Sequence, residues 1–370
     1  MLCRNLLRGT MTKMATDCLN RDTADEAPAA GRRDVVMVGV GSASPKAAAA
    51  LAHALELPIE TVVDAIYRAP VRLLGNLLPA DAGRLVDMIG ELGLEAAAVP
   101  AGRSLQRGAT FDIAGWIADP AQTEAAAAAL AIFLGTTPAI ALDTLLTPPG
   151  ILIGDVSTAT LTALERALPA GAVKLVAADP RTSRYALFAA RLSRPQADAL
   201  HPYLPTGTSI GRDGDATLFD LSRNAADAIW RRLKAPETVR IVNQAFLRFT
   251  ILLHSIPADG GAALDALAGV PEGDYPLLVG ALPVPVEVGV GYDDVAPRLA
   301  AFTAAGFGVT AELTTFACVA LDILAAPAGA LQAAGFNARP PFRTVPMAEP
   351  RALWLRAQLE AAGADVMAAA

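Results

Sequence analysis

An internal repeat constrains this 370-residue chain more than any other feature of its sequence. The segment ALAHAL, which begins at Ala50, returns as ALAIFL at Ala129. The offset of 79 residues is kept where PVRLLG, from Pro70, matches PGILIG, from Pro149. A repeat predicts small units that cover each other's apolar surfaces. A unit of about 60 residues buries too little apolar surface within itself to be very stable alone. The alternative is chance similarity between alanine-rich stretches.

Both copies predict the order strand, helix, helix, strand, helix, strand. Short apolar runs indicate the strands, and prolines mark the helix starts. In the first copy we expect strand 35–40, helix 46–55, a helix that opens at Pro58, strand 71–74, a helix after Pro79 that ends at Gly93, and strand 94–99.

Later parts of the chain follow the same order with more divergence, so the sequence predicts an α+β fold, a tandem repeat of about five small βααβαβ-like modules. The expected parts are a disordered tail at 1–33, module 1 at 34–102, module 2 at 111–179, module 3 at 180–245, module 4 at 246–313 and module 5 at 314–370. Module 3 diverges most, and a ferredoxin-like βαββαβ order would serve it as well. The apolar runs 239–254 and 307–324 predict continuous strands that join modules 3 to 4 and 4 to 5.

This element order, with a proline before the middle strand and a glycine that closes the last helix, resembles the C-terminal domain of the bacterial ribosomal stalk protein and the similarly folded adaptor of the Clp protease. The resemblance is best over 34–102 and 111–179 and poorest over 180–245. It implies a protein-binding module. The functional residues of these families do not carry over, since the helix that bears lysines in the stalk family reads LPIETVVD at 57–64 here. The acidic loop and the histidine of the adaptor are also missing.

The charge balance argues against a nucleic-acid partner. The formal net charge is −7, and both nucleic acid and anionic lipid need clustered cations. The small basic group Arg231, Arg232 and Lys234 is explained more simply as a solvated helix face.

Cysteine usage and apolar runs bear on the compartment. Three scattered cysteines, Cys3, Cys18 and Cys318, form no disulfide framework, so we expect a cytoplasmic protein without a cleaved secretory signal. The uncharged stretch 125–142 just reaches the length of a membrane span, but GTTP at 135–138 interrupts it. We therefore expect two short helices there and no membrane span.

No motif for catalysis, a metal or a cofactor stands out. His53, His201 and His254 have no ligand partners at metal-binding spacing, and His53 is expected to be a core or rim residue. Adjacent His254 and Ser255 would point to opposite faces of a strand, the wrong geometry for proton transfer.

Two weaker patterns have simple structural explanations. GVGSAS at 39–44 lacks the third glycine of a dinucleotide loop, although an anion near Lys46 remains an alternative to a tight turn. The acids Asp293 and Asp294, with Glu287 nearby, are expected to precede and cap a helix at 295–305.

By elimination the sequence predicts a non-catalytic scaffold or adaptor that binds another protein. One exposed segment is a candidate partner-binding loop, either extended like polyproline or a plain connector: Arg339, Pro340, Pro341, Phe342 and Arg343. The alternative function is an enzyme, or an accessory subunit of one, with a small-molecule pocket between modules.

Overall fold

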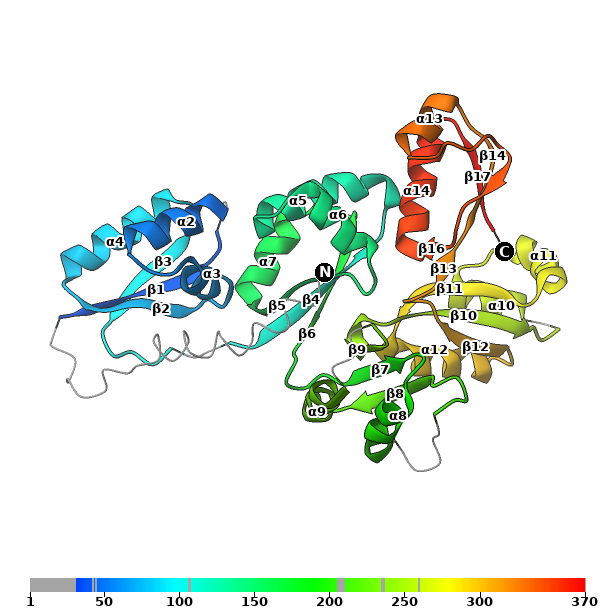
Figure 1. Cartoon of the computed structure of the whole chain (residues 1–370), viewed down its shortest axis with the longest axis horizontal. Coiled ribbons are helices and arrows are strands. Elements are labelled where there is room, and N and C mark those ends of the chain that lie inside the picture. The colour runs from blue at the N-terminus through cyan, green and yellow to red at the C-terminus, as the bar shows by residue number, and fades with distance from the viewer. Residues whose placement is uncertain are drawn as a thin grey trace. The chain divides into compact units, whose positions relative to one another are not determined.

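The chain is a mixed α and β protein in the computed structural model, with 43% of the described residues in helices and 29% in strands. The structure describes residues 31–41, 43, 45–105, 108–204, 210–233, 237–258 and 260–369. These residues form five three-stranded sheets and one two-stranded sheet (Figure 1).

Contacts divide the chain into two compact units. Unit 1 comprises Met1–Ile113, Gln122–Asp143 and Leu152–Pro180, and unit 2 comprises Ala114–Ala121, Thr144–Ile151 and Arg181–Ala370. Strand β4 (Thr110–Ile117) therefore gives its first residues to unit 1 and its last residues to unit 2.

The first sheet segment, 33–100, has its three helices packed against one sheet. Its elements are β1 (Arg33–Gly39), α2 (Pro45–Ala54), α3 (Ile59–Tyr67), β2 (Val71–Leu77), α4 (Pro79–Glu91) and β3 (Glu95–Pro100). In Figure 1, α2 and α4 lie on the same face of this sheet. Met37, Leu51, Val62 and Ile89 are fully buried in the resulting core. The sheet begins earlier than expected, because Arg33 pairs with Leu77 and Pro100 and so belongs to β1 rather than to a tail.

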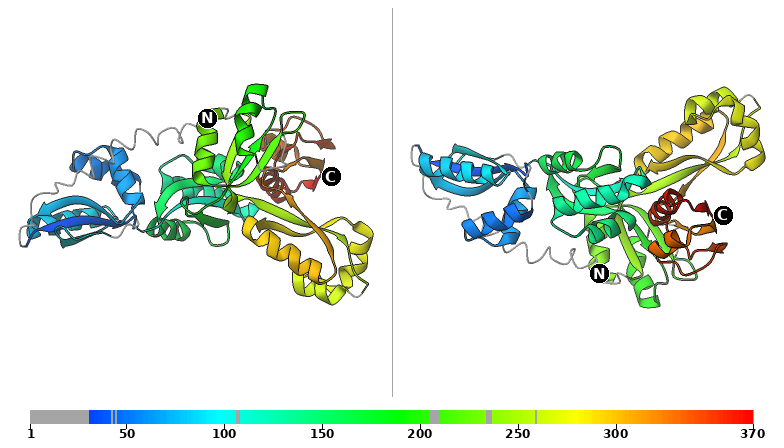
Figure 2. Two further views of the ribbon diagram at one scale, coloured as in Figure 1. Left: turned by 90° about the horizontal axis from the view of Figure 1, so that it is seen from below. Right: turned by 90° about the horizontal axis from the view of Figure 1, so that it is seen from above.

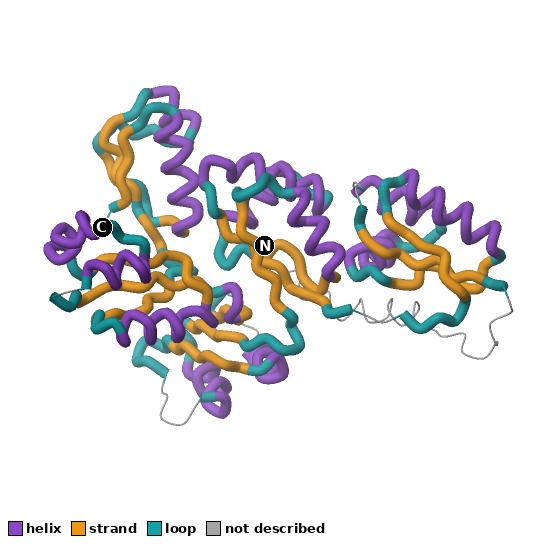
Figure 3. Tube along the Cα trace, turned by 180° about the vertical axis from the view of Figure 1, so that it is seen from behind, coloured by secondary structure: helices purple, strands orange, loops and turns teal. Residues whose placement is uncertain are grey.

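The second sheet segment, 110–178, has a similar order of strands and helices and begins with β4. Its further elements are α5 (Thr123–Leu134), α6 (Pro138–Leu146), β5 (Ile151–Ser157), α7 (Thr158–Ala167) and β6 (Val173–Ala178). Figure 3 shows α5 and α7 on the same side of its sheet. Gly135 closes α5 in the left-handed conformation, which a residue without Cβ adopts at little cost.

The break between α5 and α6 was expected from the sequence. The described part of the chain contains no single helix long and apolar enough to cross a membrane, although the bent pair Pro120–Leu134 and Pro138–Leu146 passes a test of length and composition together. The two parts of this pair meet at 116°.

The remaining three segments lie in unit 2. The third has β7 (Tyr185–Ala189), α8 (Arg194–Leu200), β8 (Ala216–Leu221), α9 (Arg223–Leu233) and β9 (Val239–Asn243). The fourth has β10 (Arg248–Ser255), α10 (Gly261–Ala268), α11 (Tyr275–Ala281), β11 (Val284–Gly291), α12 (Tyr292–Ala304) and β12 (Gly308–Leu313). The fifth has β13 (Cys318–Val319), β14 (Leu321–Ala325), α13 (Ala328–Ala333), β15 (Phe342–Arg343), β16 (Met347–Ala348), α14 (Glu349–Ala361) and β17 (Asp365–Ala368). Figure 2 shows α12 lying along the sheet of the fourth segment.

All five three-stranded sheets have the same strand order, in which the strand that comes first in the chain lies in the centre. The orders are β2-β1-β3, β5-β4-β6, β8-β7-β9, β11-β10-β12 and β15-β14-β17. In four segments a proline in a cis peptide bond stands just before the strand that comes second in the chain within its sheet: β2, β5, β11 or β15. These prolines are Pro70, Pro149, Pro283 and Pro341.

The expected continuous strands between modules do not occur. The run 239–254 is two strands of different sheets, β9 and β10, separated by a short 3-10 turn at Gln244–Phe246. The side chain of Asn243 accepts a hydrogen bond from the backbone N–H of Ala245 and so competes with a strand ladder. The turn is nevertheless buried, with Gln244, Phe246 and Leu247 all below 4% exposed. The run 307–324 is likewise divided among β12, β13 and β14.

Corresponding apolar residues of the helices differ in burial. Leu51, Ile89, Leu130 and Leu164 are fully buried, but Leu85 and Leu161 are only half-buried. Trp230 and Trp354 are also half-buried; Trp354 packs against the fifth core. Segment cores are thin enough that a helix residue one turn from the buried stripe stays at the rim.

Candidate binding groove

A surface groove of about 370 Å³ lies in unit 1 between α3 and β5. Its walls are formed by Ile59, Glu60, Val63, Asp64, Tyr67 and Arg68 around α3, and by Ile153, Gly154, Asp155 and Val156 of β5. Small-molecule pockets bury most of their ligand's surface. A groove that is open to solvent is therefore better suited to bind a segment of another polypeptide.

Helical spacing places two different stripes of α3 in this groove. Ile59, Val63 and Tyr67 recur every four residues and form an apolar stripe. Glu60, Asp64 and Arg68 form a charged stripe beside it. The opposite face of α3, which includes Val62 and Ile66, is buried in the core.

Ion pairs of Arg68 link the charged stripe to β5. The guanidinium of Arg68 lies 3.1 Å from the Asp64 carboxylate and 2.5 Å from the Asp155 carboxylate. Burial raises the pKa of Asp64; the Arg68 charge opposes this increase and the Asp155 charge adds to it. With Glu60, the groove holds three acids and one base, so its charge is net negative.

Asp155 is held in place by an unusual backbone. Its φ of 57° lies in the left-handed region, which is uncommon for residues other than glycine. Its backbone N–H donates to Oδ1 of Asp112 at 3.0 Å. A Cβ on the preceding Gly154 would lie 2.9 Å from the same oxygen, so a larger residue there would require the Asp112 carboxylate to shift. This local distortion of β5 positions the Asp155 carboxylate beside Arg68.

The end of α3 is fixed to the helices of the second segment. The hydroxyl of Tyr67 donates to the carbonyl of Phe133 at 3.0 Å, and the two rings lie 6.1 Å apart. The Tyr67 carbonyl accepts a hydrogen bond of 2.8 Å from the Thr160 hydroxyl. Burial raises the pKa of the Tyr67 phenol, which therefore stays protonated as a donor. These contacts anchor one wall of the groove to the second segment.

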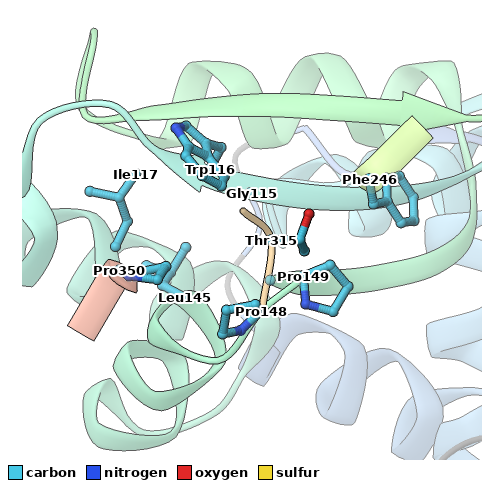
Figure 4. Close-up of a pocket in the computed structure, with 10 residues that line it drawn as sticks. Gly115, Trp116, Ile117, Leu145, Pro148, Pro149, Phe246, Thr315 and Pro350 are labelled. Atoms are coloured by element: carbon cyan, nitrogen blue, oxygen red, sulfur yellow. The ribbon is translucent and has the colours of Figure 1, made fainter. Parts of the chain in front are cut away.

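A second cavity, in unit 2, is a packing void. Figure 4 shows Trp116 of β4, Pro148, Pro149 and Thr315 around it. Its volume of about 10 Å³ is near the minimum for one water molecule. Arg248 packs over the Trp116 ring at 5.9 Å and donates to the carbonyls of Ala245 and Leu247. Burial lowers the pKa of Arg248, against the opposing influence of Asp294.

The histidines form no site. His53, His201 and His254 are all exposed, so the expectation that His53 lies in the core or at its rim was wrong: it is on the outer face of α2. His254 Nε2 lies 2.7 Å from the hydroxyl of Thr310 on the neighbouring strand. Among the described residues, no group of three or more His, Cys, Asp and Glu side chains could hold a metal ion.

The candidate loop 339–343 is partly used by the fold. Phe342 and Arg343 form β15, where Phe342 contacts the core and its ring lies 5.5 Å from that of Phe336. Arg343 makes two hydrogen bonds of 2.8 Å to Asp322. Arg339 and Pro341 remain exposed. Partner binding through this loop stays a prediction.

The other patterns from the sequence are not brought together. Asp293 and Asp294 lie inside the first turn of α12, whose N-cap is Gly291, rather than before the helix as expected. Glu287 is paired instead with Arg298. Arg231 bonds the carbonyl of Asp227 on its own helix, as for a solvated face. Of the possible anion site, Lys46 is exposed, and Ser42 and Ser44, like Lys234, lie outside the described residues.

Sequence reasoning did not single out Tyr67, Arg68 or Asp155. A signal was present, since the aligned strands 71–77 and 151–157 carry Gly-Asn and Gly-Asp pairs at matching places, a composition typical of a distorted strand. The pairing of Asp155 with a helix residue 87 positions earlier has no local signal.

No protein-family model, curated protein or solved structure matches this chain.

Proposed function

We propose that this chain is a non-catalytic cytoplasmic scaffold or adaptor of five tandem βααβαβ modules, and that its groove at α3 and β5 binds a segment of a partner protein. The repeat is supported by the five sheets, in each of which the first strand in the chain lies in the centre. It is supported too by the cis proline before the second strand of four sheets. A further support is a residue with positive φ late in the second strand of four sheets, at Asn76, Asp155, Asp220 and Gly289.

One observation carries the binding function: the groove combines an apolar stripe, a charged stripe and an anchored wall in one open concavity. Apolar contact supplies binding energy, and the charges select and orient the partner. Ile59, on the apolar stripe, is 45% exposed.

The function is tested by quantitative capture with the full chain as bait in a lysate of its native cell. Wild type should retain a protein in stoichiometric amount, and Val63→Glu should lose about tenfold or more of it, because an uncompensated charge would enter the apolar stripe. Ile132→Glu is the matched control, since Ile132 is 67% exposed on α5 and outside the groove.

Equal capture by wild type and Val63→Glu, with both variants folded by circular dichroism, would overturn the proposal. So would a small metabolite that raises the melting temperature of wild type but not of Val63→Glu, because this result favours the enzyme alternative.

A further inference from the structure

We propose that residues 1–16 of this chain occupy the groove between α3 and β5 and so regulate access to it. The inference rests on the proposed function, because it names the groove as the binding site and adds an internal competitor.

The charge of this segment complements that of the groove. Residues 1–16, MLCRNLLRGTMTKMAT, contain Arg4, Arg8 and Lys13 and no acid. The groove presents Glu60, Asp64 and Asp155 against Arg68 alone. Because Arg68 already bridges Asp64 and Asp155, a further cation would meet the carboxylate oxygens that Arg68 leaves exposed, and the Asp155 side chain is 49% exposed.

The apolar residues of the segment match the other stripe. The segment contains five large apolar residues, Leu2, Leu6, Leu7, Met11 and Met14. A segment that carries both apolar side chains and cations can place the apolar side chains in a groove and the cations at its rim. Methionine and leucine adapt to the open apolar stripe of Ile59 and Val63.

The connection is long enough for this contact. Residues 17–30 form a 14-residue connection to Gly31, which precedes β1. Arg68 lies near the far end of β1, since Val71 pairs with Met37, so the connection must return along this 7-residue strand, about 23 Å. A flexible chain of this length has an average span of about 20 Å and a maximum of about 50 Å. A span that matches the average gives a local concentration in the millimolar range, which favours the chain's own segment over that of a second copy.

The test is disulfide trapping in the full chain, with Cys3 as the natural probe. In a Cys18→Ser, Cys318→Ser background, a second cysteine is placed in the groove by Ile59→Cys or Val63→Cys. The control is Leu78→Cys, which is 52% exposed and follows the residue that pairs with Arg33, near the point where the segment is attached. Disulfide formation under mild oxidation is followed by non-reducing gels and mass mapping.

We expect an intramolecular disulfide with Cys3 to form about tenfold faster in at least one groove variant than in Leu78→Cys. Arg4→Glu with Arg8→Glu should reduce the groove rate to that of Leu78→Cys, as should 0.5 M salt, because both remove the charge attraction. Groove rates at or below the Leu78→Cys rate would overturn the proposal. Disulfides found only between two chains would overturn it in favour of a second copy, and rates unaffected by the Arg4 and Arg8 changes would overturn the charge argument.

The failure of this inference can be told apart from failure of the proposed function. If Val63→Glu abolishes partner capture but Cys3 is not trapped, the groove binds a partner and the regulatory segment is wrong. If Cys3 is trapped but capture does not depend on Val63, the segment binds and the partner site lies elsewhere. If both hold, Arg4→Glu with Arg8→Glu should increase partner capture, because the competitor is released.

Discussion

At the scale of single residues, burial and the charge of Arg68 have opposite effects on the pKa of Asp64. Burial raises its pKa in the folded protein more than Arg68 lowers it. The folded state therefore holds the Asp64 proton more tightly than the unfolded state, and ionisation of this carboxyl costs stability. The cost is absent below the unfolded pKa and fully present above the folded one.

This balance predicts a pH-dependent effect of Asp64→Asn. The free energy of unfolding of the variant, minus that of wild type, should rise as the pH rises through the unfolded and then the raised folded pKa of Asp64, and should be constant once the carboxyl is ionised in both states. Urea denaturation followed at several pH values measures the difference. A difference that does not change with pH, or that falls as the pH rises, would contradict this account of Asp64.

A second residue-scale prediction concerns the glycine before Asp155. Gly154→Ala should destabilise the protein by about 1–3 kcal/mol, because the new Cβ would meet the Asp112 carboxylate. Gly90→Ala is the control: Gly90 lies in α4 with open space at its Cβ position, so alanine should stabilise by about 0.5–1 kcal/mol. Thermal unfolding of both variants checks the opposite signs, and two effects of the same sign would be inconsistent with the role given to Gly154.

At the scale of elements, Asn243 makes two of the side-chain hydrogen bonds at the joint between β9 and β10. Asn243 is 4% exposed; it accepts from Ala245 N and donates to the Ser183 hydroxyl at 2.9 Å. Asn243→Ala should cost about 1–3 kcal/mol, because buried polar partners are left unpaired.

Limited trypsin digestion reports on this joint directly. Wild type should resist cleavage after Arg248, which is 6% exposed, whereas the exposed Arg212 should be cut. In Asn243→Ala the bond after Arg248 should become several-fold more sensitive. Rapid cleavage of wild type after Arg248 would instead identify an open linker.

At the scale of the whole molecule, each unit has its own cores. Leu51 is fully buried in unit 1, and Leu51→Ala should cost about 2–5 kcal/mol there. Hydrogen exchange should consequently accelerate in α2, α3 and β1, while the amides of β10 in unit 2 keep their protection. Equal acceleration of β10 would mean that the chain unfolds as one cooperative unit.

Much of the fold was predictable because its signals are local. Proline at the first turn of α4, the left-handed glycine after it and the apolar run of β1 act within a few residues of where they stand. The α+β character and the break between α5 and α6 were predicted on these grounds and are confirmed. The sequence also predicted the helix after Pro58 that carries Glu60 and Asp64, although it did not predict a role for these two residues.

The candidate site, by contrast, was decided by tertiary structure. Arg68 and Asp155 become partners only because α3 and β5 pack together, and hydrogen bonds of Tyr67 with Phe133 and Thr160 hold that packing. The continuous strand expected at 239–254 failed for a related reason, since the hydrogen bonds of Asn243 and the pairing of β9 and β10 with different sheets outweigh β propensity. Local sterics and spacing determine where elements begin and end, whereas a groove depends on contacts between residues far apart in the chain, and those contacts are created when the elements pack.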